Sequence, residues 1–131
     1  MGWWADCATA VVAAMIGPGP EAVHGRHDFA PDQAWQLAKI ATHYQASGRR
    51  ETYLGDWHSH PNASSGWFSW TDRRVLRKII HSPEARCAEP LMAIFWGEAE
   101  DWQTEICHAR LRPRALFWNR LVVKPAGLRV Y

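Results

Sequence analysis

Cysteines are scarce in this chain, and their placement excludes the folds that cysteines usually stabilise. Only three occur in 131 residues, Cys7, Cys87 and Cys107, and no two of them form a C-x-x-C pair. An odd number of widely spaced thiols favours neither a disulfide framework nor a zinc ribbon, and it fits a reducing compartment. We therefore expect a cytoplasmic protein without structural disulfides.

Long hydrophobic runs are lacking too. The apolar run Cys7–Ile16 has ten residues, whereas a membrane-spanning helix needs about 20. No positive charge precedes the run, so the pattern of a signal peptide is missing as well. The sequence thus indicates neither a membrane partner nor export.

A strong excess of one charge is also missing. The net charge is only +2, which does not favour a nucleic-acid partner. The C-terminal part is locally basic, with Arg110, Arg112, Arg114, Arg120, Lys124 and Arg129. Two interpretations of this basic part stay open: a solvated surface, or a docking patch for an acidic partner.

The chain does contain enough apolar sequence for a core. Hydrophobic residues make up 47% and charged residues 21%, and the length suits one domain over residues 1–131. An apolar strand is predicted over residues 8–16, before Gly17-Pro18-Gly19-Pro20. Further strands are predicted over 27–30, 51–60, 91–96, 104–111 and 116–123, and helices over 31–48 and 71–82. The second helix has Val75, Leu76, Ile79 and Ile80 on one face. This mixture predicts an α+β fold, a mixed sheet flanked by helices.

The residues that can carry chemistry lie between positions 58 and 72, in the sequence HSHPNASSGWFSWTD. His58 and His60 project from the same face of a predicted strand. Asp72 follows on the first turn of a helix and can add an oxygen ligand. Two imidazole nitrogens and one carboxylate leave the fourth position of a tetrahedral zinc ion open, as hydrolysis requires.

Each part of this pattern also has an ordinary structural explanation. A histidine pair on a strand can be a surface or core feature, and Ser69-x-x-Asp72 is a capping box with Asp in place of Glu. The joint occurrence of these parts favours zinc, and capping by Ser69 is compatible with it. The aromatic side chains around the motif could either wall a substrate groove or pack in the core; they are Trp57, Trp67, Phe68 and Trp70.

The full pattern, His-x-His-Pro, seven residues, then Ser-x-x-Asp, resembles the signature of the JAMM metalloproteases, also called JAB/MPN or Mov34/PAD-1-type. The resemblance implies that His58, His60 and Asp72 hold Zn²⁺ and that Ser69 stabilises the oxyanion. It implies a cytidine-deaminase-like fold and a deubiquitinase-like reaction. In that reaction, zinc-bound hydroxide attacks the isopeptide bond that joins a ubiquitin-like modifier to its target.

Other segments resemble a bacterial JAB subgroup. They are the Gly-Pro-Gly-Pro loop, the pattern His-x-Phe-x-Pro-Asp at 27–32, and Tyr-x-Gly-x-Trp at 53–57. That subgroup occurs beside E1- and E2-like proteins in mobile elements and antiphage operons. The implied partners are a ubiquitin-like protein or its conjugate, together with E1/E2-like proteins.

One residue of the family pattern is lacking: an upstream glutamate that serves as general base. Its place falls at or before Met1, Asp6 is the only carboxylate in residues 1–20, and Glu21 would lie at the wrong end of the strand. We therefore expect an N-terminally truncated domain without its first element. A late start codon and a naturally shortened protein would both explain this.

Three other functions are less well supported by the sequence. A non-catalytic MPN-type binding module for ubiquitin-like proteins would explain the missing glutamate. A RadC-like protein, linked to DNA repair, has the same histidine spacing, but the low net charge and the lack of a preceding DNA-binding module argue against it. A nucleobase deaminase would need H-x-E and P-C-x-x-C, which are absent.

Overall fold

A computed structural model describes residues 1–25, 29–114, 118–127 and 129, and its contacts divide the chain into two compact units, Met1–Leu54 and Gly55–Tyr131. The strands and helices are β1 (Gly2–Trp4), β2 (Ala10–Val12), β3 (Val23–His24), β4 (Phe29–Ala30), α1 (Gln33–Ala46), β5 (Gly55–Pro61), α2 (Trp70–His81), β6 (Leu91–Glu98), β7 (Asp101–Arg114) and β8 (Trp118–Ala126). The expectation of one domain stays a prediction, because two units of contacts can belong to one folding domain.

Strands β1 and β2 of the first unit form a short antiparallel hairpin. Its turn is closed by Asp6, whose Oδ1 accepts hydrogen bonds from the backbone N–H groups of Ala8 and Thr9, each at 2.7 Å. The predicted long buried strand over residues 8–16 is wrong. Only Ala10–Val12 is a strand, and Val12 is 50% exposed. Its one strand partner is the three-residue β1, which limits how far the ladder can extend.

Helix α1 begins where the sequence predicts. Asp32 caps it, because its Oδ1 accepts a hydrogen bond from the N–H of Trp35 at 3.0 Å. After the helix, Gly48 has a left-handed backbone with φ of 65°, as a stop signal requires. No residue of α1 is buried, however, and Leu37 is 57% exposed. Residues 27–28 of the strand predicted just before this helix lie outside the described residues.

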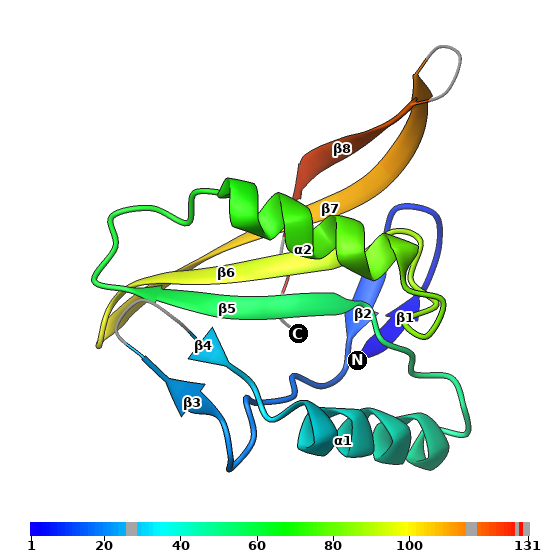
Figure 1. The fold of residues 1–131 in the computed structure, drawn as a ribbon, viewed down its shortest axis with the longest axis horizontal. Coiled ribbons are helices and arrows are strands. Elements are labelled where there is room, and N and C mark those ends of the chain that lie inside the picture. The colour runs from blue at the N-terminus through cyan, green and yellow to red at the C-terminus, as the bar shows by residue number, and fades with distance from the viewer. Residues whose placement is uncertain (26–28, 115–117, 128, 130–131) are drawn as a thin grey trace. The chain divides into compact units, whose positions relative to one another are not determined.

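The second unit is built on one four-stranded sheet with the order β5-β6-β7-β8 (Figure 1). Strands β5 and β6 are parallel, whereas β6–β7 and β7–β8 are antiparallel. The prediction of a mixed sheet in an α+β fold is therefore confirmed. The cytidine-deaminase-like arrangement and the missing first element stay predictions. Residues 116–117, the start of the last predicted strand, lie outside the described residues.

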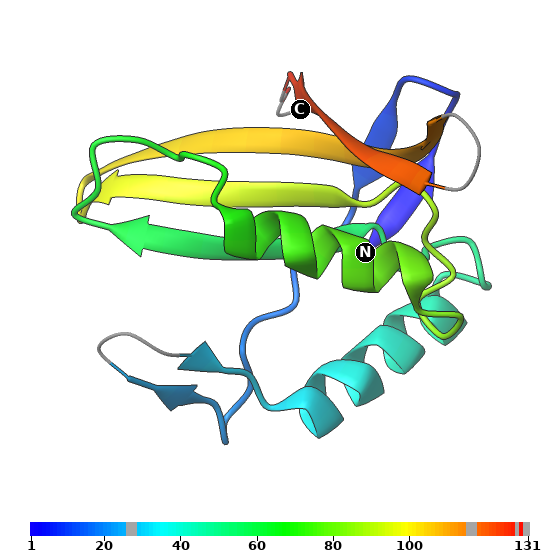
Figure 2. The same ribbon diagram turned by 45° about the horizontal axis from the view of Figure 1, so that its top comes forward.

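Helix α2 lies along one face of this sheet (Figure 2). The core beneath it consists of Leu76, Met92, Ile94, Ala109 and Leu121. The predicted apolar face of the helix is confirmed, since Leu76 and Ile79 are buried. The sheet register sets His58 opposite Ile94 and His60 opposite Trp96, so both histidines lie on the face that α2 covers. Among the described residues, no helix is long and apolar enough to cross a bilayer.

Candidate metal centre

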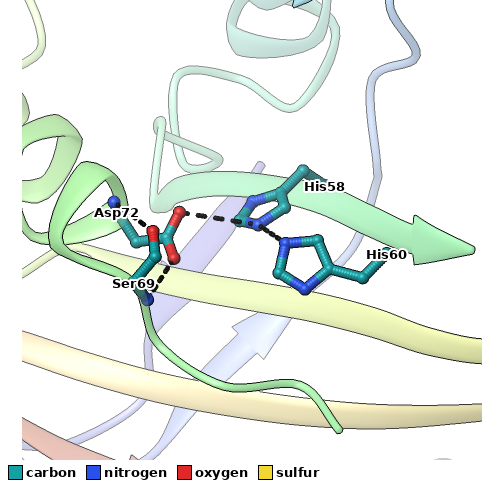
Figure 3. Close-up of polar contacts among 4 residues, drawn as sticks. All are labelled: His58, His60, Ser69 and Asp72. Carbon is teal, nitrogen blue, oxygen red and sulfur yellow. Dashed lines mark hydrogen bonds and ion pairs between the residues drawn. The ribbon is translucent and has the colours of Figure 1, made fainter. Parts of the chain in front are cut away.

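The two histidines of the motif lie side by side at the end of β5 (Figure 3). Their side chains project from one face because they are two residues apart on a strand. The Nε2 atoms of His58 and His60 are 3.0 Å apart, and the ring centroids are 4.8 Å apart. Both side chains are partly buried. The strand therefore brings the pair together as the sequence predicts.

The first turn of α2 holds the other two residues in a capping box. The backbone N–H of Asp72 donates to Oγ of Ser69 at 3.2 Å, and the backbone N–H of Ser69 donates to Oδ2 of Asp72 at 2.7 Å. The predicted capping box, with Asp in place of Glu, is confirmed. Capping fixes the orientation of the carboxylate, and Oδ1 is left facing the imidazole of His58 at 3.5 Å.

The capping interaction leaves one useful hydrogen on Ser69. Its hydroxyl oxygen accepts the N–H of Asp72, but a hydroxyl also carries a proton of its own that can be donated elsewhere. The residue lies at the N-terminus of a helix, where the aligned peptide dipoles favour negative charge. Ser69 can therefore donate a hydrogen bond to an anionic atom that binds at this end of the helix.

Burial and charge act in opposite directions on His58. Burial lowers its pKa, the carboxylates of Asp72 and Asp56 raise it less, and the neighbouring His60 lowers it further. The net effect is a lowered pKa, so the imidazole is neutral at neutral pH. A neutral imidazole is the form that binds a metal ion.

The side chains of His58, His60 and Asp72 are of the types that bind zinc, but their present positions do not match a tetrahedral site. In the described parts of the chain, no group of three or more His, Cys, Asp or Glu side chains is positioned to hold a metal ion. The Nε2 atoms of His58 and His60 contact each other at 3.0 Å, whereas two nitrogen ligands of a tetrahedral zinc ion lie about 3.3 Å apart with the ion between them. Ring rotations and shifts of a few tenths of an ångström would be needed, so the ligand assignment stays a prediction.

The four aromatic side chains near the motif divide between surface and core. Trp67 and Trp70 are 77% and 71% exposed, whereas Phe68 packs against the core under α2. Trp57 alternates with His58 along β5, so its ring lies on the opposite face of the sheet, edge-on to Phe95 at 5.9 Å. The ring of Trp57 therefore does not lie on the face that holds His58 and His60.

One residue that shapes the site was not identified from the sequence. Gly66 is buried in the loop between β5 and α2, and a Cβ atom there would lie 2.5 Å from Cδ1 of Trp96. A larger residue would clash with Trp96, so glycine allows the loop to pass close to the sheet before it reaches Ser69 at the start of α2. The one signal in the sequence is the glycine itself, within a serine-rich loop.

Comparisons with known proteins agree with the motif. The family described as prokaryotic homologues of the JAB domain matches residues 4–107, which include the whole pattern from His58 to Asp72. Over 131 residues the chain is 47% identical to a protein of Sinorhizobium fredii (strain NBRC 101917 / NGR234) named "Probable metalloprotease y4qB". The alignment covers 100% of this chain and 80% of that relative. No solved structure matches.

Proposed function

This chain belongs to the prokaryotic homologues of the JAB domain, and on that premise we propose that it is a zinc-dependent isopeptidase that removes a ubiquitin-like modifier from a conjugate. The observation that carries the proposal is the convergence of His58, His60, Ser69 and Asp72 at the start of α2. The name of the relative, a probable metalloprotease, supports the hydrolytic part. That the group removed is a ubiquitin-like protein is proposed from the resemblance of the motif alone.

In this proposal His58, His60 and Asp72 hold the metal ion. Imidazole nitrogens and a carboxylate oxygen suit Zn²⁺, and the lowered pKa of His58 keeps that ligand deprotonated. When bound, zinc supplies a Lewis acid that polarises the scissile carbonyl and activates water. The capping box supports the site, because the N–H of Ser69 orients the carboxylate of Asp72 toward His58.

Ser69 has a second task in the proposal. Its hydroxyl donates a hydrogen bond to the oxygen of the carbonyl under attack, where negative charge develops. The hydroxyl is already fixed by the N–H of Asp72, so little reorganisation is needed at the moment of reaction. The positive end of α2 adds to this stabilisation.

The general base stays a separate prediction. Asp6 is the carboxylate nearest its expected place in the sequence, but its Oδ1 accepts the N–H groups of Ala8 and Thr9 in the β1–β2 turn. Asp6 is therefore a turn residue, and it is not assigned as the general base. Such a base contributes about 10²–10⁴-fold to the rate.

A non-catalytic binding module for ubiquitin-like proteins is the alternative. It would account for the lack of a glutamate in residues 1–20, where Asp6 is the only carboxylate. In this alternative the chain binds the modifier without turning it over.

Cleavage of a linear fusion between a ubiquitin-like protein and a reporter tests the proposal. The protein is loaded with zinc, and His60→Ala is compared with His43→Ala, a matched histidine variant in α1. We expect slow zinc-dependent cleavage by the parent and by His43→Ala, because no residue of the chain is assigned as the general base, and none by His60→Ala. Zinc binding with no cleavage by any of them would favour the binding module, and equal cleavage by both variants would refute the site.

A further inference from the structure

The outward side of α2 carries a concentrated positive charge. Its exposed basic residues are Arg73, Arg74, Arg77, Lys78 and His81, and we call this set the basic stripe. The only acidic residue of the helix, Asp72, is 6% exposed and is engaged in the capping box. The exposed charged residues of α2 are therefore all basic.

Part of this charge is arranged unfavourably for the helix itself. Arg73 and Arg77 are four residues apart, as are Arg74 and Lys78, and like charges at this spacing repel each other. Two of the arginines also lie close to the start of the helix, where the helix dipole disfavours cations. No described carboxylate forms a salt bridge with any cation of the stripe. Lys78 and His81 lie in the last turn, where the dipole favours cations. Arg73 and Arg77, however, gain neither a salt bridge nor a favourable dipole position.

An exposed tryptophan lies at the N-terminal end of the basic stripe. Trp70 is 71% exposed, and the guanidinium of Arg74 lies 4.8 Å from the centre of its ring. Trp70 directly follows Ser69, so the stripe starts beside the proposed reaction site. From Trp70 to His81 the helix rises about 16 Å, the length of about five extended residues.

We propose that the basic stripe is a docking surface for an acidic segment of the polypeptide substrate, with Trp70 as the apolar anchor nearest the scissile bond. The proposal rests on the proposed function, which places an amide bond beside Ser69. Unpaired cations along the stripe call for an anionic occupant. A polypeptide is favoured over a nucleic acid because the stripe leads away from groups that would hydrolyse an amide.

A direct binding experiment tests the docking surface without requiring turnover. A labelled peptide of about five glutamates, the length that the helix rise sets, is compared by fluorescence anisotropy with an all-glutamine peptide. We expect only the acidic peptide to bind, and to bind more weakly at higher salt. The variant Arg74→Gln/Arg77→Gln/Lys78→Gln should bind it about tenfold more weakly.

The chain offers a matched control in the β7–β8 hairpin. Arg112→Gln/Arg114→Gln/Arg120→Gln removes the same charge from another exposed surface, and we expect it to bind like the parent. If the two triple variants lost affinity for the acidic peptide equally, docking on the basic stripe would be refuted, because only the total charge would then matter. A single-stranded DNA of equal charge that binds the stripe more tightly than the peptide would also overturn the proposal.

A cleavage experiment separates failure of docking from failure of the proposed function. Two fusion substrates carry the glutamate or the glutamine segment beside the scissile bond. The stripe variant should raise KM for the acidic substrate about tenfold, with kcat unchanged. Peptide binding without cleavage of either substrate would refute the proposed function alone. Equal KM for both substrates in the parent, with no peptide binding, would refute the docking surface alone.

Discussion

Replacing Ser69 with alanine separates the two tasks assigned to this residue. As N-cap, its Oγ accepts the N–H of Asp72 at 3.2 Å, and loss of such a cap costs about 1 kcal/mol of folding stability. In a domain of this size that lowers Tm by about 4 °C. As oxyanion donor, its removal lowers kcat by about 10²–10³-fold.

The stability loss cannot account for an activity loss of that size. A domain with about 5–15 kcal/mol of stability stays almost fully folded after losing about 1 kcal/mol. Asp32→Ala is the matched control, because it removes the cap of α1, a hydrogen bond to the N–H of Trp35 at 3.0 Å. Both variants should show similar losses of Tm by calorimetry.

Steady-state cleavage of the fusion substrate then decides the role of Ser69. We expect kcat to fall in Ser69→Ala and to stay near the parent value in Asp32→Ala. Equal kcat values in the two variants would mean that Ser69 only caps the helix, and the oxyanion assignment would be wrong.

Three more variants or conditions follow from the same structure. Asp72→Asn should weaken zinc binding in a competitive chelator titration, because an amide is a poorer ligand than a carboxylate; unchanged affinity would reduce Asp72 to a capping role. Leu76→Ala should cost about 2–5 kcal/mol in urea unfolding, since the side chain is fully buried, and a smaller loss would contradict the packing under α2. Burial raises the pKa of Cys87 and of Cys107 to about 11; stability should be complete below about pH 9 and fall as the pH rises toward about 11. A urea midpoint that is constant over this range in the parent would contradict the burial of the two thiols.

Local signals in the sequence were enough to predict much of the proposed site. The capping box follows from the three-residue spacing of Ser69 and Asp72, and the buried side of α2 follows from the helical spacing around Leu76. The shared face of His58 and His60 follows from strand alternation. Each of these features depends on residues close together in the chain, which is why the sequence predicts them.

Features that depend on distant partners were not predictable in the same way. The extent of β2 is set by its pairing with the short β1, and the exposure of Leu37 depends on what packs against α1. The contact between the histidine rings depends on rotamers that no sequence pattern encodes. Trp57 is different, because its alternation with His58 already predicts the opposite face.

Zinc content tests directly whether His58, His60 and Asp72 form a metal site. The parent protein and His60→Ala are loaded with zinc, passed over a desalting column and analysed by mass spectrometry for metal per chain. We expect about one zinc ion per chain in the parent, as a single site with His and Asp ligands requires, and almost none in His60→Ala. Equal zinc content in the two proteins, or none in the parent, would contradict it.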